Sequence, residues 1–141
     1  MESPGGKSDL GEEEGMGERE LALTEVGTNE VEIMVFYLDV EDGRGGSYRG
    51  YFGVNVAKVL KIMRMPEQTM SPPSGSHHGV IGAFHFKDRD CVVPLIGLAR
   101  YLDQKRVDTP DPKVIITEFN QVTTAFVVTG VTRIHRLTWS E

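Results

Sequence analysis

Cys91 and His85 are the residues of this 141-residue chain whose types and spacing come closest to nucleophilic catalysis. A catalytic thiol needs a lowered pKa and a base close to it. Cys91 is the only cysteine, and His85 precedes it by six residues in a segment with the pattern of a β-hairpin. Such a hairpin could place the imidazole across from the thiol, so a thiol-dependent enzyme is one hypothesis. The alternative, which we favour, is a small core residue beside a histidine satisfied by its neighbours.

The other chemistry-bearing residues do not form a recognisable site. Zinc needs three or four ligands at a compatible spacing. His77 and His78 are adjacent in a loop-like segment, with no third ligand nearby in the sequence. No nucleophile elbow is present, and no glycine-rich loop opens a helix as a phosphate-binding loop does. The sequence therefore predicts neither a metal nor a cofactor.

The segment 79–102 positions Cys91 and His85. It begins with an apolar run over 80–86, continues with the charged turn Lys87-Asp88-Arg89-Asp90, and returns as a second apolar run over 91–93. Pro94 follows, and then a pattern typical of a short amphipathic helix, with apolar residues along one side at Leu95, Leu98, Ala99 and Leu102. The pattern predicts two buried strands joined by a charged turn and followed by a helix.

Short apolar segments at regular spacing predict the rest of the fold. They occupy 31–40, 48–54, 59–65, 113–119, 122–129 and 131–139, with turn-rich loops between them. Asn55 is a candidate N-cap for a single helical turn. Both faces of the first segment are apolar, which is typical of a strand covered on both sides. The sequence predicts an all-β fold with short helices. Its apolar surplus indicates either two packed β units or a groove that binds another protein.

Charge is concentrated at the N-terminus. Residues 1–30 contain nine acidic and two basic side chains, a net charge of −7, whereas residues 31–141 have a net charge of +1. A nearly neutral folded part lacks the basic excess that a phosphate backbone requires, so nucleic-acid binding is not expected. We interpret residues 1–27 as a disordered acidic tail, because they contain too few large apolar side chains to bury a core. The domain is expected over 28–141.

Several features indicate a cytoplasmic protein. No segment approaches the roughly 20 apolar residues that span a bilayer. The N-terminus lacks the basic and apolar regions of a signal peptide. A single cysteine allows no intramolecular disulfide.

Four stretches, in sequence order, resemble the CheW-like domain family. They are 32–38 (EIMVFYL), 51–62 (YFGVNVAKVLKI), 82–98 and 125–137 (AFVVTGVTRIHRL). The end of the last stretch, RIHRLTW at 133–139, is most similar to the CheW-like module of CheV proteins. The resemblance covers about residues 28–141. It implies two SH3-like small β-barrels packed against each other, which would explain strands that are apolar on both faces.

The family resemblance also implies a function and a set of residues. CheW-like proteins are non-catalytic adaptors that couple the cytoplasmic tips of chemoreceptors to the histidine kinase CheA. Val59 matches an apolar residue that faces the receptor groove in the family, and Lys61 follows in the same segment. The family's Asn-Leu-Arg-Gly turn matches 85–88, with Lys87 in the arginine position beside Asp88. Because the turn is two residues longer here, Arg89 is a second candidate for the functional cation.

The chain departs from the family pattern in two respects. Family aspartates are replaced by Gly97 and Thr129, which removes the contacts that those carboxylates make. CheW-like domains also continue with strands that return to the first barrel, and CheV proteins add a receiver domain. The resemblance therefore predicts either a fragment or an incomplete first barrel with an exposed sheet edge. A truncated, nonfunctional remnant is the third hypothesis beside the adaptor and the thiol enzyme.

Overall fold

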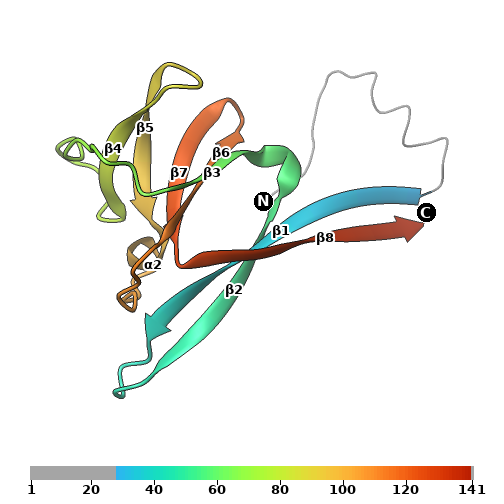
Figure 1. The fold of residues 1–141 in the computed structure, drawn as a ribbon, viewed down its shortest axis with the longest axis horizontal. Coiled ribbons are helices and arrows are strands. Elements are labelled where there is room, and N and C mark those ends of the chain that lie inside the picture. The colour runs from blue at the N-terminus through green and yellow to red at the C-terminus, as the bar shows by residue number, and fades with distance from the viewer. Residues whose placement is uncertain (1–27, 141) are drawn as a thin grey trace. The chain divides into compact units, whose positions relative to one another are not determined.

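The computed structural model describes residues 28–140, which contain eight strands and two short helical segments (Figure 1). Residues Glu32–His135 form one compact unit, and all contacts discussed below lie within it. The described residues 28–31 and 136–140 belong to a second unit. The predicted acidic tail over 1–27 lies outside the described residues.

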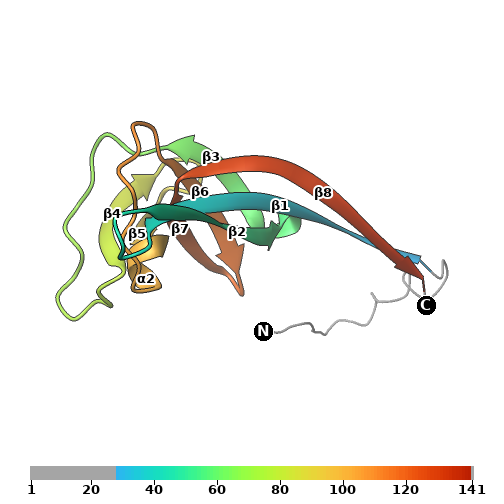
Figure 2. The ribbon, with the colours of Figure 1, turned by 90° about the horizontal axis from the view of Figure 1, so that it is seen from below.

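The strands form two sheets, and the all-β prediction is confirmed. The order in the first sheet is β2-β1-β8, with bounds Ser47–Asn55, Thr28–Glu41 and Gly130–Ser140. Figure 2 shows β8 running beside β1. The order in the second sheet is β3-β6-β7-β5-β4, with bounds Val59–Arg64, Lys113–Phe119, Val122–Val128, Cys91–Gly97 and Val80–Phe86.

Two short helical segments connect these strands. The 3-10 turn η1, Val56–Lys58, lies between β2 and β3, and the helix α2, Leu98–Tyr101, follows β5. The predicted cap at Asn55 is confirmed, because its side-chain oxygen accepts a hydrogen bond from the Ala57 N–H at 2.9 Å. This capped turn takes the chain from the three-stranded sheet to the five-stranded sheet.

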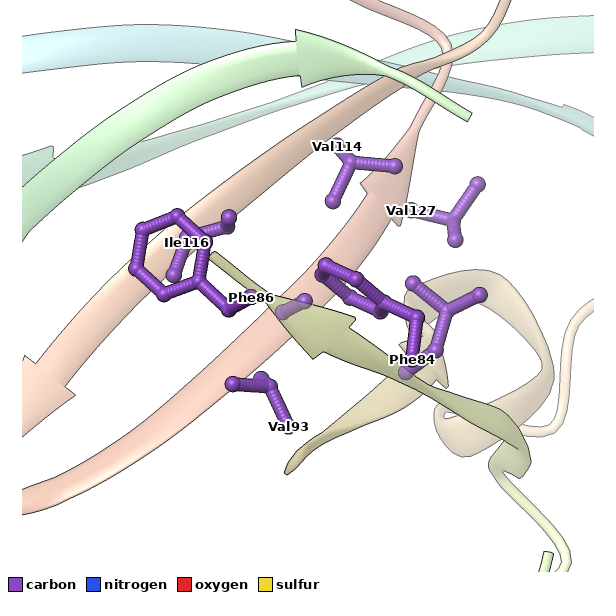
Figure 3. Packing of buried hydrophobic residues seen from close by; sticks show 8 residues of the cluster. Phe84, Phe86, Val93, Val114, Ile116 and Val127 are labelled. Carbon is purple, nitrogen blue, oxygen red and sulfur yellow. The ribbon is translucent and has the colours of Figure 1, made fainter. Parts of the chain in front are cut away.

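Strand β6 shows why the strands are apolar on both faces. Val114 and Ile116 point into the core of the five-stranded sheet, together with Phe84 and Phe86 of β4 (Figure 3). Ile115, between them, belongs to a second core, which it shares with residues of β1 such as Met34, Phe36, Leu38 and Val40. Successive side chains of a strand point to opposite faces, so one strand serves two cores. The predicted packing of two β units is confirmed as two sheets with a common core.

The helix predicted to begin directly after Pro94 is wrong. Strand β5 continues through Pro94 to Gly97, and only four residues of α2 follow. Leu95, Ile96 and Gly97 pair in parallel with Ala125, Phe126 and Val127 of β7. A short apolar run fits a buried strand as well as a helix, and here pairing with β7 and burial of Leu95 decide for the strand.

A long connection, residues 65–79, joins β3 to β4 (Figure 2) and contacts the rest of the fold at Met70 and at Gly79. Met70 and Ala83 exchange two backbone hydrogen bonds, of 2.7 and 3.0 Å, along the outer edge of β4. Gly79 lies directly against Tyr101 of α2, where a Cβ atom would overlap the tyrosine. The connection therefore covers part of an edge strand that would otherwise present free backbone groups.

Candidate functional site

The turn between β4 and β5 carries three of the predicted site residues on the surface. Lys61 Nζ of β3 lies 3.4 Å from Asp88 Oδ2, and Arg89 Nη1 lies 3.4 Å from Glu118 Oε1 of β6. Lys87 is exposed and has no ion-pair partner among residues 28–140. Exposed ion pairs of this length contribute little to stability, at most about 1 kcal/mol. The turn is thus a solvated structure that leaves one cation, Lys87, available to a partner.

A pocket of about 550 Å³ opens beside this turn. Lys61, Lys87 and Asp88 lie in its wall with Glu67, and its apolar part includes Met63 and Phe84. The structure therefore brings together three of the five predicted site residues. Arg89, which is paired with Glu118, and Val59, at the start of β3, do not line this pocket.

Val59 lies elsewhere, beside the second core. It is half-buried, packs against that core, and pairs with Thr117 of β6. Val59 therefore contributes to packing whatever else it contacts.

Next to Val59 the surface contains an apolar groove of about 320 Å³. Thr117, the partner of Val59 in the β3–β6 pairing, is one of its lining residues. Aromatic and aliphatic side chains form most of the remainder: Phe36, Phe52, Val54, Leu98, Leu102, Ile115, Phe119 and Phe126. Phe119 and Leu102 are 44% and 41% exposed, so they stand at its rim. The sequence analysis did not identify these residues as a site, because they come from five separate elements. The one local signal was a phenylalanine at a strand end, directly before a turn.

The thiol-enzyme hypothesis for Cys91 and His85 is wrong. In the β4–β5 register Cys91 is opposite Phe86, and His85 is opposite Val92. Cys91 packs against the core of the five-stranded sheet, whereas His85 is exposed and its Nε2 atom lies 2.8 Å from Asp90 Oδ1. The thiol and the imidazole therefore point to opposite faces of the hairpin, and His85 does not stand beside the thiol.

Because Cys91 is half-buried against the core, we expect its native thiol to react slowly with a chromogenic disulfide reagent. Opening of the hairpin should limit the reaction, so denaturant should accelerate it on the order of tenfold or more. The chain has one cysteine, and the absorbance change therefore reports this position alone. Equal rates in native and denatured protein would contradict the packing described for Cys91.

His77 and His78 fasten the β3–β4 connection to α2. His78 Nε2 lies 2.8 Å from Asp103 Oδ1 and 3.1 Å from the Arg100 carbonyl oxygen, and both oxygens are acceptors, so this nitrogen donates. The His77 ring stacks on His78 and contacts Tyr101, with centroid distances of 4.3 and 4.6 Å. Within residues 28–140 no three histidine, cysteine or acidic side chains are placed to hold a metal ion. In the same part of the chain no helix has the length and apolar character needed to cross a membrane.

The domain consists of two β-sheets, and its surface carries an apolar groove and a charged turn. These are features of a binding domain. The model of the CheW-like domain family matches residues 24–141. The chain belongs to the CheW-like domain family, and the resemblance seen in the sequence is confirmed.

One curated relative and one solved structure agree with this assignment. The chain is 37% identical over 101 residues to chemotaxis protein CheV3 of Helicobacter pylori, an alignment that covers 69% of this chain and 30% of that protein. The crystal structure of the scaffolding protein TtCheW from Thermoanaerobacter tengcongensis has the same fold, with a TM-score of 0.55 at 18% identity. That match covers 76% of this chain and 65% of TtCheW. The matched part of the chain therefore spans less than two thirds of either relative.

Proposed function

We propose that this CheW-like domain is a non-catalytic adaptor of chemotaxis signalling, which couples chemoreceptors to the histidine kinase CheA. The names of its relatives support this role, since one is a chemotaxis protein and the other a scaffolding protein. The observation that carries the proposal is the apolar groove beside Val59. An adaptor works by positioning its partners, and a groove of aromatic side chains offers binding energy without any reacting group.

The occupant that we propose for the groove is a helix of the receptor tip. An amphipathic helix binds by laying its apolar face into a hydrophobic groove. Phe119 and Leu102 at the rim remain partly exposed in the free protein, so a helix that covers them removes apolar surface from water. Val59 supports this surface from the adjoining strand through its pairing with Thr117.

Lys87 is the cation that we propose for orientation and partner choice at the charged turn. Arg89 is engaged with Glu118 and Asp88 with Lys61, so the free ammonium of Lys87 is the group most available to an acidic side chain of the kinase or receptor. Rim charges of this kind act mainly on association rate and specificity. Lys61, Asp88 and Arg89 then hold the turn in place around it.

Phe119→Glu tests the groove. A carboxylate without a partner in an apolar contact is costly to desolvate, and loss of an aromatic anchor in a binding surface commonly weakens binding by roughly 30-fold or more. We therefore expect the variant to lose co-sedimentation with a reconstituted complex of receptor cytoplasmic fragment and CheA. Lys58 Nζ lies 6.0 Å from the Phe119 ring centroid, so the free variant should accommodate the new charge and remain folded.

Val122→Glu is the matched control. Val122 pairs with Phe119 across the β6–β7 hairpin, is 61% exposed, and does not line the groove. It should bind as the wild type does, with circular dichroism confirming that both variants are folded. Equal binding by the two variants would reject the groove as the contact surface. Val59→Asp is a less informative variant, because Val59 also packs against the core.

A further inference from the structure

A third concave surface lies between α2 and the chain that follows it. The pocket has a volume of about 350 Å³ and is lined by three cationic side chains, Arg100, Lys105 and Arg106, with Gln104 and the apolar side chains of Ile81 and Leu98. Its backbone is fixed, because the Glu41 N–H donates to the Lys105 carbonyl oxygen and the Val107 N–H donates to the Asp39 carbonyl oxygen, both at 2.8 Å. Lys105 and Arg106 therefore belong to a segment that is held against the end of β1, whereas Arg100 belongs to α2.

Residues 28–140 do not fully balance the charge of this pocket. Its lining residues in the described part of the chain include no carboxylate. The nearby acidic residues are Glu41, 3.8 Å from Lys105 Nζ, and Asp103, which is bound to His78 at 2.8 Å. Three cations and the two carboxylates of Glu41 and Asp103 leave an excess of one positive charge around the pocket.

Arg106 makes this imbalance energetically significant. Its Nη1 nitrogen is shielded from solvent and has no hydrogen-bond acceptor among residues 28–140. A shielded, charged N–H group without an acceptor is unfavourable, because its lost hydration is not replaced. The guanidinium charge is delocalised over a rigid plane. An anion in the pocket that contacts the solvent-accessible part of the Arg106 guanidinium would therefore offset the charge of the whole guanidinium, including the shielded Nη1.

We propose that this pocket binds a phosphate monoester. Such a group carries a charge of about −1.5 to −2 near neutral pH, which is opposite in sign to the three cations of the pocket lining. Arginine is suited to it, because its parallel N–H groups bind two phosphate oxygens at once. The apolar side chains of Ile81 and Leu98 would contact the organic part of the ester. This site shares Leu98 with the proposed receptor groove but has otherwise different lining residues, and the proposal does not depend on the function of the groove.

The direct test is to titrate the purified full chain with phenyl phosphate. Binding is measured by calorimetry and by the change in the midpoint temperature of thermal unfolding. We expect phenyl phosphate to bind and raise the midpoint, and benzoate at the same ionic strength to bind roughly tenfold or more weakly, because it carries one charge. A phosphoserine peptide is titrated in parallel. Tighter binding of the peptide would identify a phosphoprotein as the source of the group, and tighter binding of phenyl phosphate a free metabolite. Absence of binding by both, or equal binding of benzoate, would overturn the proposal.

Arg106→Met separates a binding role from a structural one. Methionine keeps an unbranched stem and removes the charge, so the midpoint of the free protein should stay the same or rise, while the phenyl phosphate affinity falls roughly tenfold or more. Arg100→Gln, at an exposed position of the pocket wall, should weaken binding without affecting the fold. Arg44→Gln, in the exposed loop after β1 and outside the pocket, is the control and should bind normally. Should Arg106→Met fail to fold, unchanged binding by Arg100→Gln would reject the site.

Discussion

Truncation of Ile115 or of its neighbour Ile116 to alanine is expected to lower the free energy of unfolding by about 2–5 kcal/mol in either case. The two residues are adjacent in β6 and are 2% and 0% exposed. They belong to different cores, Ile116 to that of the five-stranded sheet and Ile115 to that between the sheets. Each truncation therefore leaves a cavity in a separate region. Denaturant unfolding followed by circular dichroism measures both changes.

Ile62→Ala is the matched control for these truncations. Ile62 is directly opposite Ile115 in the β3–β6 pairing but is 43% exposed. The same chemical change should cost less there, on the order of 1 kcal/mol, because water already contacts the side chain. The result could also be that one of the two truncations, at Ile115 or Ile116, lowers the free energy of unfolding by the full amount and the other hardly changes it. One face of β6 would then be open to solvent, which would contradict the two-core arrangement.

Gly79→Ala is expected to destabilise the fold by about 1–3 kcal/mol through overpacking. A Cβ atom at this position would lie 2.7 Å from Tyr101 Cβ and 2.8 Å from Tyr101 Cα. Because one of these atoms is backbone, rotation of the tyrosine side chain cannot relieve the overlap. Either α2 or the β3–β4 connection must move, which would disturb the contacts of His77 and His78. Thermal unfolding measures the cost, and faster amide exchange over 66–79 would locate it.

Gly50→Ala is the corresponding control in a strand. A Cβ atom at Gly50 would lie 3.5 Å from the Phe52 ring, an ordinary van der Waals distance. Alanine is favoured over glycine within a strand by roughly 0.5–1 kcal/mol, so this variant should be as stable as the wild type or slightly more so. If Gly79→Ala behaved in the same way, the close approach of Gly79 to Tyr101 would be contradicted.

The sequence by itself determined the strands and the reason for their composition. Apolar periodicity placed seven of the eight described strands within three residues of their observed bounds, and it ended β5 four residues too early, because alternation reports which side chains a strand buries. The doubly apolar first strand indicated cover on both sides, but only the face with Met34, Phe36, Leu38 and Val40 is buried in a core. Ile33, Val35 and Tyr37 on the other face are half-buried, so this prediction was wrong for that face. Asn55 identified its helical turn, since an N-cap acts on backbone groups two residues away. These features depend on interactions between near neighbours in the chain.

The partner-binding roles of Val59, Lys61, Lys87, Asp88 and Arg89 remain predictions. They come from a family resemblance, and a resemblance assigns a position rather than a contact. The structure adds that Lys87 is the unpaired cation of its turn and that Val59 also packs against the core.

Only the tertiary structure decided which residues meet. Register separated Cys91 from His85, because a shift of one residue moves a side chain to the opposite face of a strand. Pairing with β7 kept Leu95 and Ile96 in a strand despite a helical pattern. The β6–β7 turn holds Gln121 at a φ of 67°, which glutamine rarely adopts on its own. The apolar groove and the cationic pocket likewise combine residues from distant segments, since long-range pairing brings them together after local preferences have been satisfied.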